Sequence, residues 1–274
     1  MSLTDRDNLL FQLLGRAEAA TLLRDVIASG ADVNARDGTL QRTPLMFAAE
    51  HARTPEVVRI LITAGAKVNA RDKLGRTALM FAAEKNTNPA ITRLLLRAGA
   101  DVNARDEVFQ KTVLMESARH NTSPEIMRLL IEAGAVTTVR DELGRTALMI
   151  AAEKNRSAEV LQVLVDAGGN IDARDELGRT ALMLAAQINT NVAMFDVLIA
   201  AGSKIDARDE VGRTALIYAA WSNGNPAVLE QLLAAGANPK AHDREGMLAF
   251  NYAKDNETLR GSDVYWLLND ARFE

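Results

Sequence analysis

The chain alternates short apolar segments with polar ones, and the whole pattern returns every 34 or 35 residues. The first apolar segment of each repeat reads T-A-L-M-x-A-A, as at residues 77–83 and 146–152. A second segment carries Leu and Ile at helical spacing, as in Ile91, Leu94 and Leu95. Apolar residues spaced at i, i+3 and i+4 are typical of amphipathic helices. The pattern therefore predicts two helices per repeat, followed by an extended finger.

One aspartate marks the period with little variation. It recurs at Asp37, Asp72, Asp106, Asp141, Asp175 and Asp209. The decapeptide RDELGRTALM around it occurs twice without change, at residues 140–149 and 174–183. A repeat this regular predicts a stack in which each repeat buries its apolar face against its neighbours.

Capping residues predict where the helices begin and end. A threonine precedes each first helix, where its hydroxyl can accept a backbone N–H bond; these are Thr43, Thr77, Thr112, Thr146, Thr180 and Thr214. Second helices are expected to begin after the pairs Thr54-Pro55, Asn88-Pro89, Ser123-Pro124 and Asn225-Pro226. The glycine of each Ala-Gly doublet is expected to end the second helix in a left-handed conformation.

These motifs resemble the ankyrin repeat over nearly the whole chain. The resemblance is carried by G-R-T-A-L-M-x-A-A at residues 75–83 and A-G-A-D-V-N-A-R-D at residues 98–106. It implies an all-α, ankyrin-repeat solenoid of helix-turn-helix pairs with short hairpin-like fingers. We expect a single domain at residues 1–274, with a capping segment at 1–36, six regular repeats at 37–242 and a second capping segment at 243–274.

The sequence departs from the family pattern in two ways. Thr-Pro-Leu-His becomes Thr-Ala-Leu-Met, so that methionine replaces a histidine that ties the turn by hydrogen bonds; Met80, Met115, Met149 and Met183 occupy this position. We expect apolar packing of the thioether to offset the lost tie. Each repeat is also one residue longer, between its helices. These departures favour a divergent, bacterial member, with an engineered array as the alternative.

Composition excludes several classes of function. The 274 residues include 36 acidic and 32 basic side chains, a net charge of −4, which argues against a nucleic-acid partner. No apolar stretch is long enough for membrane insertion. We expect a soluble monomer without cofactor, in the cytoplasm, or in the periplasm or outside the cell if a leader was removed.

Candidate chemistry is sparse. There is no cysteine, and the three histidines, His51, His120 and His242, fall in different repeats, so we expect neither a metal site nor a catalytic group. Each finger aspartate is expected to fix its own turn. Arg140, Arg174 and Arg208 are expected to pair with carboxylates of adjacent fingers.

The resemblance implies that a partner binds a concave face formed by fingers and first helices. The first-helix residues on that face are Glu50, Glu84, Arg119, Glu153, Gln187 and Trp221. Its fingertip residues include Lys73, Leu74, Leu143, Leu177 and Val211.

Three residues of this face depart from the repeat. Trp221 stands at a position that is polar elsewhere, either as a partner anchor or folded onto Tyr218 and the capping segment. Glu116 replaces an apolar residue and is expected to pair with Arg119, three residues later. Phe109 lies in a lengthened finger of the same repeat.

These features favour a non-catalytic scaffold that binds another protein. Two alternatives remain open: a small-ligand or hydrolytic site near Glu116, Arg119 and His120, and a purely structural spacer.

Overall fold

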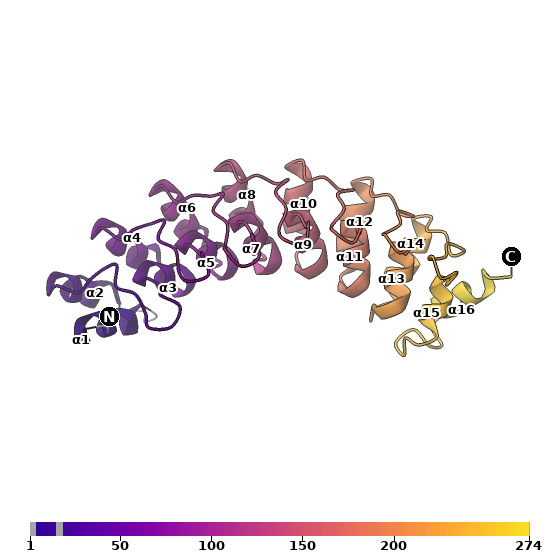
Figure 1. Cartoon of the computed structure of the whole chain (residues 1–274), viewed down its shortest axis with the longest axis horizontal. Helices are drawn as coiled ribbons and strands as arrows, with labels where there is room; N and C mark the ends of the chain where they lie inside the picture. Colours follow the sequence, from indigo (N-terminus) through magenta and orange to yellow (C-terminus); the bar gives the residue numbers. More distant parts are fainter. Residues whose placement is uncertain (1–3, 15–18, 274) are drawn as a thin grey trace. The chain divides into compact units, whose positions relative to one another are not determined.

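The computed structural model of the protein describes residues 4–14 and 19–273, which contain sixteen helices (Figure 1). The chain divides into two compact units, Met1–Val136 (unit 1) and Thr137–Glu274 (unit 2). Unit 1 contains α1 (Asp5–Leu13), α2 (Ala19–Ala28), α3 (Pro44–His51), α4 (Pro55–Thr63), α5 (Ala78–Lys85), α6 (Pro89–Arg97), α7 (Val113–His120) and α8 (Pro124–Glu132). Unit 2 contains α9 (Ala147–Lys154), α10 (Ala158–Asp166), α11 (Ala181–Ile188), α12 (Val192–Ala200), α13 (Ala215–Ser222), α14 (Pro226–Ala234), α15 (Ala249–Ala253) and α16 (Asp263–Asp270).

Within each unit the helices form two rows (Figure 1). In unit 1, α3, α5 and α7 pack side by side, and α2, α4, α6 and α8 form the second row. Unit 2 repeats this arrangement with α9, α11, α13 and α15 against α10, α12, α14 and α16. The described residues contain no strand, only isolated bridges such as Arg105–Thr112. The predicted all-α solenoid architecture is confirmed. The domain boundaries at residues 36 and 242 stay predictions, and residues 1–3, 15–18 and 274 of the capping segments lie outside the described residues.

The core lies between the two rows and is built from small and aliphatic side chains. In α5 and α11 every residue from the first helical position to the second alanine of the Ala-Ala pair is buried. Helices of eight residues are too short to be stable alone, so their stability comes from this packing. The alanine pairs let neighbouring first helices approach closely.

The methionine that replaces histidine keeps a hydrogen bond to the turn. Thr180 Oγ1 accepts the N–H of Met183 at 3.4 Å, and the Met183 sulfur accepts the N–H of Thr180 at 3.5 Å. The same reciprocal pair forms at Thr43 and Met46, Thr112 and Met115, and Thr146 and Met149. These methionines are buried, in line with the expected apolar packing, and the thioether sulfur, a weak acceptor, restores part of the lost tie as well.

Second helices begin and end largely as expected. Asn88, Ser123 and Asn225 accept backbone N–H bonds at their N-termini, whereas Thr54 makes no side-chain capping bond, contrary to the prediction. At the C-terminus of α6, Gly99 has a φ of 84°, a conformation that costs little only without a Cβ.

The longer turn between the helices contains a buried asparagine that connects each repeat to the one before it. In unit 2, Asn189 Nδ2 donates to the carbonyls of Ala152 (2.8 Å) and Asn155 (3.0 Å), while its Oδ1 accepts the N–H of Asn191 at 3.0 Å. The other members of this asparagine ladder repeat the two donor bonds: Asn86 and Asn121 in unit 1, and Asn223 and Asn256 in unit 2. The longer turn thus carries asparagine hydrogen bonds between repeats, which were not predicted from the sequence.

Replacing one ladder residue should destabilise unit 2. Asn189→Ala removes three hydrogen bonds and leaves buried carbonyls unpaired, so we expect the free energy of unfolding to fall by about 2–4 kcal/mol. Urea denaturation followed by far-ultraviolet circular dichroism measures the change. Thr190→Ala, at the exposed neighbouring position, is the matched control. Equal midpoints for the two variants would show that the ladder contributes no net stability.

Candidate functional site

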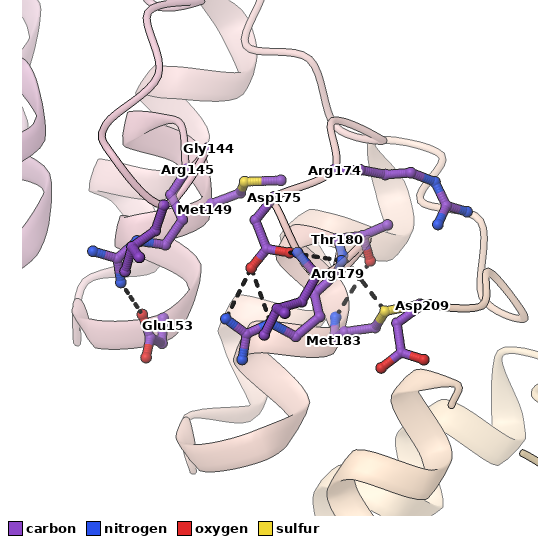
Figure 2. A network of polar contacts seen from close by, with 12 residues as sticks. Gly144, Arg145, Met149, Glu153, Arg174, Asp175, Arg179, Thr180, Met183 and Asp209 are labelled. Atoms are coloured by element: carbon purple, nitrogen blue, oxygen red, sulfur yellow. Dashed lines mark hydrogen bonds and ion pairs between the residues drawn. The ribbon is translucent and has the colours of Figure 1, made fainter. Parts of the chain in front are cut away.

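Each finger is fixed by its aspartate, as the sequence predicted. Asp175 is buried, and its Oδ1 accepts the N–H groups of Leu177 (3.0 Å) and Arg179 (2.8 Å). Its Oδ2 accepts the Arg179 side chain at 2.8–2.9 Å (Figure 2). Asp72, Asp141 and Asp209 also accept two backbone N–H bonds within their fingers. One oxygen of each of these carboxylates is thus committed to its own turn.

The arginine before that aspartate joins successive fingers. Arg174 Nη1 donates to the carbonyls of Gly178 (2.9 Å) in its own finger and of Arg208 (2.6 Å) in the next. Arg140 and Arg208 donate to the equivalent carbonyls. For Arg174 and Arg208 the predicted pairing with carboxylates was wrong within the described residues, because the finger backbone presents carbonyls within their reach.

The fingertips of unit 2 form a row of exposed apolar side chains. Leu143, Leu177 and Val211, here called the fingertip strip, have exposed fractions of 50%, 55% and 44%. Their carbonyls accept the N–H groups of the next fingertip, at Glu176 (3.1 Å), Glu210 (3.1 Å) and Arg244 (2.9 Å). A Cβ on Gly178 would lie 3.1 Å from the Glu210 nitrogen, so a side chain there would push the neighbouring finger away. The strip is therefore apolar, exposed and held by backbone bonds.

First-helix acids of the predicted face are engaged by arginines of the preceding finger. Arg42 lies 3.1 Å from Glu50, Arg145 lies 3.3 Å from Glu153, and Arg76 pairs with Glu84 (Figure 2 shows the Arg145–Glu153 pair). Glu50 also accepts Lys85 at 2.6 Å and is only 8% exposed. The Arg-x7-Glu spacing that makes these pairs was present in the sequence and was missed. Gln187, the equivalent residue in α11, is half-buried.

Trp221 packs onto Tyr218 and the C-terminal capping segment, which was one of the two alternatives for it. Its ring lies 6.3 Å from that of Tyr218 and 5.9 Å from that of Tyr252 in α15, so it does fold onto its neighbours. The Arg213 guanidinium lies 4.7 Å from its ring centroid. Even so, 44% of the residue remains exposed. Burial and a hydrogen bond to Asp209 raise the pKa of Tyr218, which therefore remains a neutral donor. A supported and partly open tryptophan suits an anchor role.

Glu116 pairs with a lysine rather than with Arg119. Lys111 Nζ lies 3.7 Å from Glu116 Oε1, and both side chains are more than nine-tenths buried. The predicted Glu116–Arg119 pair is not present among residues 4–14 and 19–273. The two residues do line one pocket of about 210 Å³ with Leu74, Val108 and Phe109. Lys73 is exposed beside it, and its N–H donates to Leu40.

The histidines do not converge on this pocket. His120 is exposed and does not line it; partial burial and the charge of Arg119 hold the pKa of His120 below its usual value. His51 lies 3.6 Å from Glu50, and His242 contacts its neighbour's carbonyl. Within the described ranges no three His, Asp or Glu residues are grouped as metal ligands would be. Nor is any helix described there long and apolar enough to cross a membrane.

Comparison with protein families agrees with this geometry. A family model described as "Ankyrin repeats (3 copies)" matches residues 13–106, 85–175 and 154–243. The chain belongs to the ankyrin-repeat family. A comparison with curated proteins found no match. Ankyrin repeats are generally non-catalytic modules of protein–protein interaction, so the family implies protein partners without indicating which.

Glu50 should make the stability of this ankyrin-repeat protein depend on pH. Burial raises the pKa of Glu50, but the hydrogen bond and charge of Lys85, with the charges of His51 and Arg42, outweigh that and hold this pKa below its ordinary value. A lowered folded-state pKa adds stability that is complete above the unfolded value and lost as pH falls through the folded one. We expect Glu50→Gln to unfold at lower urea concentration than wild type at pH 7, and the gap to shrink by pH 3. A gap that is constant with pH would contradict this, and Glu132→Gln controls for the loss of one exposed carboxylate.

Proposed function

We propose that this protein is a non-catalytic scaffold that binds another protein through its fingers and first helices, on the face expected to be concave. The observation that carries the proposal is the fingertip strip of unit 2. Exposed apolar side chains on a soluble protein are often binding surfaces when they are contiguous and rigidly held. Here three of them recur at the same position of consecutive fingers, each 44–55% exposed.

The polar groups around the strip support an apolar contact. Arg174, Asp175 and Arg179 are already hydrogen-bonded within the fingers. A partner that covers the strip therefore buries few unpaired polar groups. Apolar burial contributes roughly 25 cal/mol per Å². The backbone bonds between fingertips keep the surface preorganised, so little ordering entropy is lost on binding.

Trp221 is proposed as the anchor of the same face in unit 2. It stands on α13 in the position that Glu153 and Gln187 occupy on α9 and α11. Tryptophan is enriched among interface residues whose loss costs about 2 kcal/mol or more. In unit 1 the proposed contact residues are Lys73, Leu74, Phe109 and Arg119. Glu50 and Glu84 contribute mainly by holding the face in place, because both are paired.

Charging the strip should abolish partner capture without unfolding the protein. The variant Leu143→Asp, Leu177→Asp, Val211→Asp places three carboxylates on exposed positions, so the circular dichroism melting curve should change little. We expect affinity capture from source lysate, quantified by mass spectrometry, to lose at least one protein that wild type retains.

The matched control adds the same charge to the second helices. Ala158→Asp, Ala193→Asp and Ala227→Asp lie in the first turns of α10, α12 and α14, where the helix dipole favours acids. This control should capture partners as wild type does, and recombinant partner should then bind wild type directly. Equal capture by all three proteins would show that the strip is not the binding surface. Capture of nothing by wild type would favour the structural-spacer alternative.

A further inference from the structure

The pocket beside α7 in unit 1 contains one arginine, Arg119, that is not part of an ion pair among the described residues. Four of the other charged side chains form pairs: Arg76 with Glu84, and Lys111, at 3.7 Å, with Glu116. Asp106 accepts the N–H groups of Val108, Phe109 and Lys111 at 2.6–3.0 Å. Arg119 has no hydrogen-bond or ion-pair partner in the part of unit 1 that the structure describes, although it is half-buried.

Comparison among the repeats shows that the arginine at position 119 is accompanied by a second substitution in the same helix, at Glu116. In three other repeats the basic residue of the finger pairs with a glutamate eight positions later, as Arg145 does with Glu153. In α7 that position is Arg119, and Lys111 is paired instead by Glu116, where the other repeats have Phe47, Phe81, Ile150, Leu184 or Tyr218. In this repeat the glutamate stands three positions earlier in the helix, at Glu116. Lys111 therefore still has a carboxylate partner, while Arg119 has none. Packing alone gives no reason for this exchange.

The walls of the pocket are apolar and partly come from the lengthened finger. Leu74 and Val108 line it from successive fingers, and Phe109 is added by the extra finger residue, with its ring 4.9 Å from Lys111 Nζ. The finger accommodates this residue by placing Gln110 at a φ of 55°, which is uncommon for a residue other than glycine. At about 210 Å³ the pocket is smaller than the roughly 300–1,000 Å³ of typical small-molecule sites. It has the size for one or two side chains.

We propose that this Arg119 pocket binds a segment of a partner protein in which an aspartate or glutamate neighbours a bulky apolar residue. The guanidinium forms paired hydrogen bonds with a carboxylate, and the geometry of its planar fork is suited to that group. The neighbouring apolar side chain packs between Leu74, Val108 and Phe109. The proposal concerns unit 1 only and holds whether or not the fingertip strip binds a partner.

A selection from random peptides tests this chemistry on the full chain. Phage-displayed dodecapeptides are selected on wild type after depletion on the double variant Glu116→Ile, Arg119→Glu. That variant reproduces the arrangement of Ile150 and Glu153, so Lys111 regains the usual partner and the melting temperature should not fall. We expect the enriched peptides to share an acidic residue beside Leu, Ile, Met, Phe or Trp. Peptides without an acid, or no enrichment over the double variant, would overturn the proposal.

Synthetic copies identify the interacting groups. N-acetylated, C-terminally amidated peptides should bind wild type, and their Glu→Gln or Asp→Asn forms about tenfold or more weakly. Arg119→Gln should cause a similar loss, since Gln187 shows that a first helix accepts glutamine at this position; Arg128→Gln, an exposed arginine of α8, should cause none. Binding only by peptides with a free C-terminal carboxylate, or unchanged affinity for Arg119→Gln, would refute the proposed occupant.

Discussion

Stacked repeats bring irregular backbone together, and every buried carbonyl and N–H of that backbone must find a partner. Regular helices satisfy their own groups, but turns and fingers do not. Here side chains supply the missing partners between repeats: each ladder asparagine pairs carbonyls of the preceding repeat, and each finger arginine pairs a carbonyl of its own finger and one of the next. The decapeptide RDELGRTALM recurs because its arginines, aspartate and threonine each make hydrogen bonds that the finger or the first helix needs.

This constraint separates positions that build the stack from positions that are free to bind. Asp175, Arg179 and Thr180 are committed to backbone or to each other, so substitution there would cost stability first. The fingertip strip takes part in the hydrogen bonds between fingers only through its backbone, so its side chains can vary without removing any of these bonds. The paired glutamates are intermediate cases. Glu50 lies on the expected binding face but is buried, and its charge is already paired with Arg42 and Lys85.

The sequence predicted what depends on local pattern and missed what depends on contacts between repeats. Helix positions, threonine caps and terminal glycines follow from neighbouring residues, and they were predicted almost throughout, with Thr54 as an exception. The Lys111–Glu116 pair was not predicted, because i,i+3 spacing favoured Arg119 and only the folded finger shows that Lys111 is nearer. The asparagine ladder did leave a signal. Asn86, Asn121, Asn155, Asn189 and Asn223 recur at the repeat spacing. The acceptors of Asn86, Asn121, Asn189 and Asn223 lie 34–38 residues earlier and cannot be recognised without the stack.

The need to pair buried charges also determines which substitutions one repeat can accept together. Reversing the charge at position 119 alone would leave Lys111 buried without a partner, which is costly for an ammonium group. Supplying the acid from position 116 removes that penalty, although it gives up the apolar contact that other repeats make there. The two departures therefore form one coupled change, and neither has an evident use for stability without the other. Gln187 and Trp221 also depart from glutamate at this position, but only Arg119 is accompanied by an acid at the apolar position of its helix, and this coupling is why the proposed binding role is placed there.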